Sequence, residues 1–285
     1  MRSKNLLQGL AIVFALSVPN AGSQSHFASE QQERFIDVDG SSLRIIEMAP
    51  LSPIVVFISG LGEDAGTWRK VQPQIAKFAR TVSYDRAGLG RSMPTDQPRD
   101  VESLAAELHK LLSAARISRP LVLVGHSLGG SIARVYSVKY PEDVAGLVLV
   151  DPEDSRLLDV LRTRMTAVDW EHRQAALAKA LPNMPPAVRA EQNAFGESGA
   201  IMARTGLPRQ VPTALITGTK KNPAFPGNPL EQDLKLEIHR ADIAKVNGGR
   251  HVLVPESRHY IQSDAPEAVI EAVKDIVNTA VTGYR

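Results

Sequence analysis

The residues with the most chemical content surround one serine near the middle of the chain. Ser127 stands in the segment GHSLGG at residues 125–130, which matches the pattern G-x-S-x-G. Four apolar residues, 121–124, precede the segment, and a helix-forming stretch, 131–140, follows it. A sharp turn between strand and helix strains the backbone at the serine, and glycines let the two elements approach closely. The spacing predicts an exposed, nucleophilic hydroxyl; the alternative is a serine that only caps the helix.

Two further segments extend this pattern. Residues 83–92, SYDRAGLGRS, are similar to the D-R-x-G-x-G-x-S segment of one superfamily, and His259 precedes a tyrosine late in the chain. Together with the Ser127 segment they resemble the serine hydrolases of the α/β-hydrolase superfamily, over nearly everything after residue 33. The resemblance implies an α/β fold: a mostly parallel, twisted sheet with helices on both faces and a small helical lid. It says less about the substrate, because one fold carries many chemistries.

The resemblance also implies the base that activates Ser127. Members of the superfamily carry serine, acid and histidine in that order, and serine needs such a base at neutral pH. His259 fits, because it lies between a predicted strand at 250–254 and a predicted amphipathic helix at 264–280. His126, beside the serine, is expected to line the pocket or to pack. The other histidines are interpreted as solvated: His26, His109, His172, His239 and His251.

The acid departs from the pattern of many members, which carry it in a G-x-x-D context before the final helix pair. Here the segment ALITG at 214–218 is followed by TKKN, with no carboxylate. A variation within the superfamily places the acid one strand earlier, and Asp151 directly follows the apolar segment 146–150. We therefore expect Asp151 to orient His259; an Asp-Pro turn is the alternative. The lesser candidates are Glu153, Asp154 and Asp233.

The oxyanion hole is a second departure. The family often begins it with His-Gly after the third strand, whereas the predicted strand 54–58 ends here in SGLG. Ser59 replaces the histidine, but the glycines remain. The backbone N–H groups of Leu61 and Leu128 are expected to face the oxygen that becomes negative in a tetrahedral intermediate, where each is worth about 3 to 4 kcal/mol. A flexible glycine turn is the alternative.

Composition is typical of one catalytic domain. The 285 residues are 43% hydrophobic and 22% charged, with a net charge of +2, which allows a sizeable core. No basic run is interleaved with aromatic residues, so nucleic-acid binding has little support. The sequence has no Gly-rich phosphate loop and no metal-spaced His or Cys cluster. The expected reaction needs neither a cofactor nor a metal.

The N-terminal residues 1–23 are interpreted as a signal peptide. Two basic residues precede an apolar stretch, 6–18, that is short for a bilayer span, and small residues follow at Ala21 and Ser23. We expect cleavage near Ser23 and a periplasmic or secreted protein without a stable membrane span. An uncleaved anchor is the alternative. The absence of cysteine agrees only weakly with export.

The rest of the chain alternates between strands and helices. Two strands at 33–38 and 42–48 are expected to form a hairpin around an Asp-Gly pair. Such alternation predicts a mostly parallel sheet covered by helices on both faces. The further strands are predicted at 54–58, 81–84, 121–124, 145–150, 213–217 and 250–254, and a typical amphipathic helix at 101–116.

One segment interrupts the alternation. Residues 153–210 contain no convincing strand and are interpreted as a helical lid inserted into the core, which comprises residues 24–152 and 211–285. Its size suits a small or medium acyl substrate. Lid side chains that can face a substrate pocket are Trp170, Met184 and Phe195, although sealing the lid against the core explains each of them as well.

The expected activity is hydrolysis of a small or medium carboxylic ester through an acyl-enzyme intermediate. Cleavage of another bond, such as a lactone, an amide or a carbon–carbon bond next to a ketone, uses the same triad and stays open. A non-catalytic member of the fold that binds a small ligand is the alternative from another class. Serine in place of aspartate at position 127 argues against epoxide hydrolase and haloalkane dehalogenase activity.

Overall fold

The computed structural model of the chain describes residues 31–154, 156–221 and 228–283. The predicted signal peptide and its cleavage position lie outside these residues. In the described part of the chain, no helix combines the length and the hydropathy that a bilayer span requires.

The described residues form one eight-stranded sheet in the order β1-β2-β4-β3-β5-β6-β7-β8. β1 pairs antiparallel with β2, and β2 with β4, whereas the other neighbouring strands are parallel. The strands are β1 (Gln32–Val38), β2 (Ser41–Met48), β3 (Ile54–Ile58), β4 (Arg80–Tyr84), β5 (Leu121–His126), β6 (Val144–Val150), β7 (Thr213–Gly218) and β8 (Arg250–Val254). The α/β architecture predicted from the sequence is confirmed, and each predicted strand ends within two residues of the observed one.

Both faces of the central strands are buried, because helices cover each of them. Along β3, Val56 packs into one apolar cluster, and its neighbour Phe57 packs into another on the opposite face. Parallel strands buried on two faces are continuous apolar runs, which is why the sequence pattern located them well. The first face is covered by α2 (Val101–Ala114) and α3 (Leu128–Lys139), and the second by α1 (Gln72–Ile75) and α10 (Pro266–Gly283).

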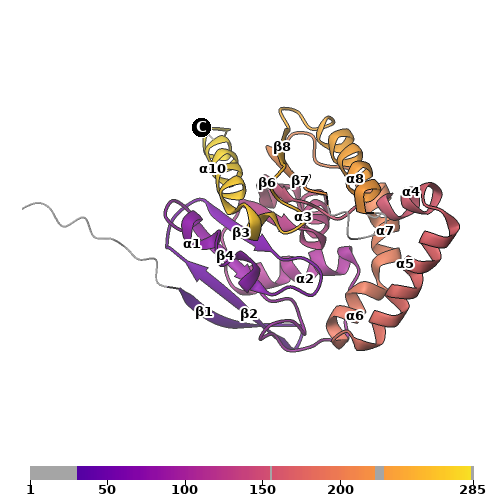
Figure 1. Cartoon of the computed structure of the whole chain (residues 1–285). Helices are drawn as coiled ribbons and strands as arrows, with labels where there is room; N and C mark the ends of the chain where they lie inside the picture. Colours follow the sequence, from indigo (N-terminus) through magenta and orange to yellow (C-terminus); the bar gives the residue numbers. More distant parts are fainter. Residues whose placement is uncertain (1–30, 155, 222–227, 284–285) are drawn as a thin grey trace, which may run out of the picture.

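Between β6 and β7 the described residues form four α-helices, here called the helical insertion. Figure 1 shows these helices gathered at the side of the molecule away from β1 and β2. The insertion meets α8 (Asn228–Ile243) through a small apolar cluster that contains Leu157, Leu161 and Leu234. Its helices are α4 (Arg156–Arg164), α5 (Ala167–Ala180), α6 (Pro186–Asn193) and α7 (Phe195–Arg204).

Candidate active site

Ser127 lies on the turn between β5 and α3, with φ of 51° and ψ of −120°. A positive φ is rare for a residue with a side chain, and it persists only where the surroundings enforce it. Here the elements on both sides approach closely. A Cβ on Gly125 would lie 2.3 Å from the carbonyl oxygen of Gly129, and a Cβ on Gly129 would lie 2.1 Å from that of Ile58. Both positions therefore require glycine.

His259 lies in the loop after β8, where its Nδ1 is 2.7 Å from Oδ2 of Asp151. A carboxylate only accepts hydrogen bonds, so Nδ1 carries a proton, and in the neutral ring Nε2 keeps its lone pair. Ser127 and His259 line the same cavity. An imidazole in this tautomer can accept a proton from a serine hydroxyl.

Asp151 directly follows β6 and is fully buried, also at a positive φ, of 42°. Its Oδ1 accepts a hydrogen bond from the N–H of Gly218 at 3.1 Å. Its Oδ2, besides facing His259, accepts one from Nζ of Lys235 at 2.6 Å. Burial raises the pKa of Asp151, but the charge of Lys235 and the hydrogen bond from His259 lower it to about 2. The carboxylate therefore stays ionised at neutral pH.

The end of β7, where many superfamily members carry the acid, has another use in this chain. A Cβ on Gly218 would lie 1.9 Å from the carbonyl oxygen of Arg258, so the loop that carries His259 passes directly over this strand end. β7 contributes a backbone N–H to Asp151 in place of a carboxylate. Lys235 could not be predicted as a partner of Asp151 from the sequence, because 84 residues separate the two.

The rival carboxylates occupy other environments. Asp233 is exposed and pairs with Lys221 at 2.8 Å. Asp154 is buried but faces arginines, among them Arg156. Glu153 lines the same cavity as Ser127, whereas the carboxylate that contacts His259 is Asp151.

The two residues predicted to supply the oxyanion donors, Leu61 and Leu128, line the cavity together with Ser127. Leu128 is the first residue of α3, and the first N–H groups of a helix have no acceptor within it. Leu61 lies in the loop after β3, whereas the N–H of Leu128 lies at a helix N-terminus, which favours a developing negative charge.

Arg86, from the second sequence motif, fixes the loop that carries Leu61. Its guanidinium is buried and donates to the carbonyl oxygens of Ser59 and Gly60, each at 2.6 Å. The same group forms an ion pair with Glu191 of α6, with 2.6 Å between Nε and Oε1. The helical insertion thus helps to hold the loop after β3.

The cavity has a volume of about 550 Å³ and lies between the carboxyl edge of the sheet and the helical insertion. Of the side chains predicted to line it, His126 and Phe195 do so. Trp170 packs instead against the apolar cluster shared by α4 and α8, and Met184, which follows a short turn of helix, is not part of the lining. The remaining lining side chains of the insertion and α8 include Leu158, Arg173, Gln174, Leu177, Gln192 and Glu231.

The cavity wall is charged as well as apolar. Arg173 of α5 and Glu231 of α8 form an ion pair at 3.1 Å. Burial, followed by the nearby charge of Glu231, raises the pKa of Glu153 to about 7. The described residues contain no group of three or more His, Cys, Asp or Glu side chains arranged to hold a metal ion.

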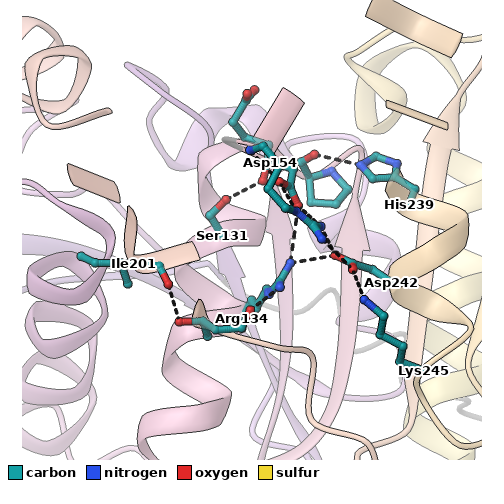
Figure 2. Close-up of polar contacts among 11 residues, drawn as sticks. Ser131, Arg134, Asp154, Ile201, His239, Asp242 and Lys245 are labelled. Carbon is teal, nitrogen blue, oxygen red and sulfur yellow. Dashed lines mark hydrogen bonds and ion pairs between the residues drawn. The ribbon is translucent and has the colours of Figure 1, made fainter. Parts of the chain in front are cut away.

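A buried ionic cluster fixes the segment that follows Asp151 (Figure 2). Arg134 of α3 lies 2.9 Å from Asp242 of α8 and 3.5 Å from Asp154. Arg156, at the start of α4, contacts both of these carboxylates. Figure 2 shows Arg134, Asp154 and Asp242 pointing toward one another. The cluster ties the beginning of the insertion to both helices.

His239 corrects one expectation from the sequence. It is not solvated but 2% exposed, with Nε2 3.1 Å from the carbonyl oxygen of Pro152 and Nδ1 2.8 Å from the hydroxyl of Thr217. Burial lowers its pKa to about 4, so the ring is neutral at pH 7. His239 lies on the buried face of α8. Helical periodicity alone does not distinguish this buried face from a polar, solvated one.

Comparisons with known proteins agree with this architecture. Protein YqjL of Bacillus subtilis (strain 168) is 31% identical over 125 residues, which make up 44% of this chain and 49% of YqjL. The chain thus spans about half the length of the first curated relatives it matches.

Solved structures show the same fold. The protein lip1 from Acinetobacter baumannii AYE has a TM-score of 0.68 and 19% identity, over 89% of this chain and 93% of lip1. A thermophilic esterase from Thermogutta terrifontis has a TM-score of 0.62 and 19% identity, over 87% of this chain and 99% of the esterase. A family model described as the alpha/beta hydrolase fold matches residues 53–245. The chain therefore belongs to the alpha/beta hydrolase family.

Proposed function

We propose that this protein is a serine hydrolase that cleaves a small or medium carboxylic ester through an acyl-enzyme intermediate. The observation that carries the proposal is the 2.7 Å contact between Nδ1 of His259 and Asp151 beside a cavity that Ser127 also lines. This contact supports a base whose free nitrogen is available for the serine. The esterase likeness supports the fold that such chemistry uses.

In the proposed mechanism, His259 takes the proton of Ser127 as the hydroxyl attacks the ester carbonyl. Asp151 holds the imidazole in the required tautomer and stabilises the imidazolium. The N–H groups of Leu61 and Leu128 stabilise the oxyanion. His259 then returns the proton to the leaving alkoxide, and a water molecule, activated by the same base, hydrolyses the acyl-enzyme and regenerates Ser127.

The cavity supports a substrate of limited size. Its volume of about 550 Å³ falls within the roughly 300 to 1,000 Å³ of small-molecule sites. Apolar side chains from the insertion, including Leu158 and Phe195, offer contact to a short or medium acyl chain.

The test is covalent labelling with a fluorophosphonate probe, read by intact mass and peptide mapping, together with hydrolysis of p-nitrophenyl butyrate. We expect labelling confined to Ser127, none in Ser127→Ala, and a fall in kcat of about 10⁴-fold in Asp151→Asn. Asp233→Asn, at an exposed aspartate, is the matched control and should keep full activity.

A folded, monodisperse protein that neither reacts with the probe nor hydrolyses esters would contradict the proposal and favour a non-catalytic binding role. Labelling of Ser127 without ester turnover would direct the search to lactones, amides and carbon–carbon bonds next to ketones.

A further inference from the structure

His126, the residue before Ser127, joins two loops of the candidate site. Its ring is 1% exposed. Nε2 lies 3.0 Å from the carbonyl oxygen of His259, and Nδ1 lies 3.0 Å from Oε2 of Glu63. The same carboxylate oxygen accepts the N–H of Gly60 at 2.7 Å. One imidazole thus connects the loop after β3, which carries Leu61, with the loop that carries His259.

The two partners determine how many protons the pair holds. A carbonyl oxygen and a carboxylate can only accept hydrogen bonds. Opposite an ionised Glu63, both contacts of His126 are hydrogen bonds only if both ring nitrogens carry a proton. Burial raises the pKa of Glu63, but the hydrogen bond and charge of His126 lower it below its ordinary value, which agrees with an ionised carboxylate.

We propose that His126 is a doubly protonated positioning residue. Together with Glu63 it fixes the position of the loop after β3, which carries Leu61, relative to the loop that carries His259. The proposal rests on the function proposed above, since it assigns the pair to the reaction of Ser127. Two aromatic side chains also face the ring: His259, with 4.7 Å between ring centroids, and Tyr260, with 5.4 Å.

The position of both loops matters because the oxyanion donors and the base act on the same bound carbonyl. A displacement of about 1 Å of a catalytic group can cost about 10²-fold in rate. Gly60 shows how closely the parts fit, since a Cβ there would lie 3.0 Å from both Glu63 and His126. Loss of the pair should therefore lower kcat more than it changes KM.

Glu63→Gln separates charge from position. A glutamine oxygen can accept the N–H of Gly60 while its amide N–H donates to a neutral Nδ1. We expect this variant to keep kcat within a few-fold at pH 7. Glu63→Ala should lose about 10²-fold in kcat with little change in KM. Glu237→Gln, at an exposed glutamate on α8, is the control.

The protonation itself is read by ¹⁵N NMR of the histidine side chains in the full chain, with His126 assigned by its absence in His126→Asn. At pH 7 the wild-type ring should show two protonated nitrogens, and the Glu63→Gln ring one. A neutral wild-type ring, or a kcat that Glu63→Ala leaves unchanged, overturns the proposal. The NMR result does not depend on turnover, so absence of esterase activity would count against the proposed function and leave the pair testable.

Discussion

At the scale of single residues, the carboxylate of Asp151 contacts three different groups. Oδ2 receives both His259 and Lys235, while Oδ1 receives the N–H of Gly218. A cation on the oxygen that faces the base opposes the imidazolium that forms during catalysis. The same cation lowers the pKa of Asp151 and keeps this carboxylate ionised.

Lys235→Gln removes this cation, so the pKa of Asp151 should rise from about 2 toward its ordinary value. A carboxyl whose pKa is lowered in the folded state stabilises the fold at neutral pH, so each unit of this rise costs about 1.4 kcal/mol of unfolding free energy at pH 7. Denaturant unfolding should show this loss at pH 7, and the loss should shrink as the pH falls through the pKa of Asp151. Lys235→Arg keeps the charge and should unfold near the wild type. Lys221→Gln controls for loss of a surface lysine, and an equal loss in both glutamine variants would contradict this account.

Glu153 should make stability depend on pH. Its pKa is raised to about 7 in the folded chain by burial and then by Glu231, above the ordinary glutamate value of about 4.3. The folded state therefore holds the proton more tightly, and the stability this contributes is lost as the pH rises through 7. Glu153→Gln should raise Tm by about 3 °C at pH 8 and little at pH 5; Glu142→Gln, at an exposed site, should show no such difference.

At the scale of elements, the turn between β5 and α3 is held by close packing rather than by hydrogen bonds alone. Gly125→Ala would place a methyl group 2.3 Å from a backbone oxygen, and we expect it to lower the free energy of unfolding by more than 2 kcal/mol. Gly196→Ala is the matched control, because nothing lies within 4 Å of its Cβ. It sits in α7 and should stabilise by about 0.5 to 1 kcal/mol. Thermal or denaturant unfolding measures both changes, and equal effects would contradict this account.

Sequence predicted the elements better than the contacts between them. Strands such as 54–58 are local apolar runs, and their bounds were predicted closely. The last helix is divided, because α9 (Ile261–Asp264) ends before Pro266, which begins α10; a residue before proline leaves the helical region. The partners Lys235 and Glu63 were missed, because their contacts cross 84 and 63 residues of chain and no local pattern records them.

At the scale of the whole molecule, the groups of the candidate site come from the carboxyl ends of β3, β5 and β6 and from the loop after β8. Ligands in parallel sheets bind at this edge. The helical insertion lies against it (Figure 1), and side chains from α4, α5, α6 and α7 complete the cavity. Selectivity should therefore reside in the insertion, and the reaction in the core.

Phe195→Ala tests this division. Phe195 lines the cavity from the first turn of α7, so its loss removes apolar contact with the acyl chain. We expect kcat/KM for p-nitrophenyl octanoate to fall about tenfold, and that for the acetate to change less than threefold. Val168→Ala, at an exposed apolar residue of α5, should affect neither ester. An equal loss for both esters would mean that Phe195 supports the reaction and not chain-length preference.

The positive φ angles of Ser127 and Asp151 imply a trade-off between fitness for chemistry and robustness of the fold. Evolution by stability alone would favour glycine at position 127, since glycine adopts this backbone freely. Ser127→Gly and Ser127→Ala both remove the hydroxyl, but only glycine relieves the strain of the positive φ. The free energy of unfolding of Ser127→Gly should therefore be about 1 kcal/mol higher than that of Ser127→Ala. That difference measures the stability which the native chain forgoes to present its serine, and no difference would show that the turn is unstrained.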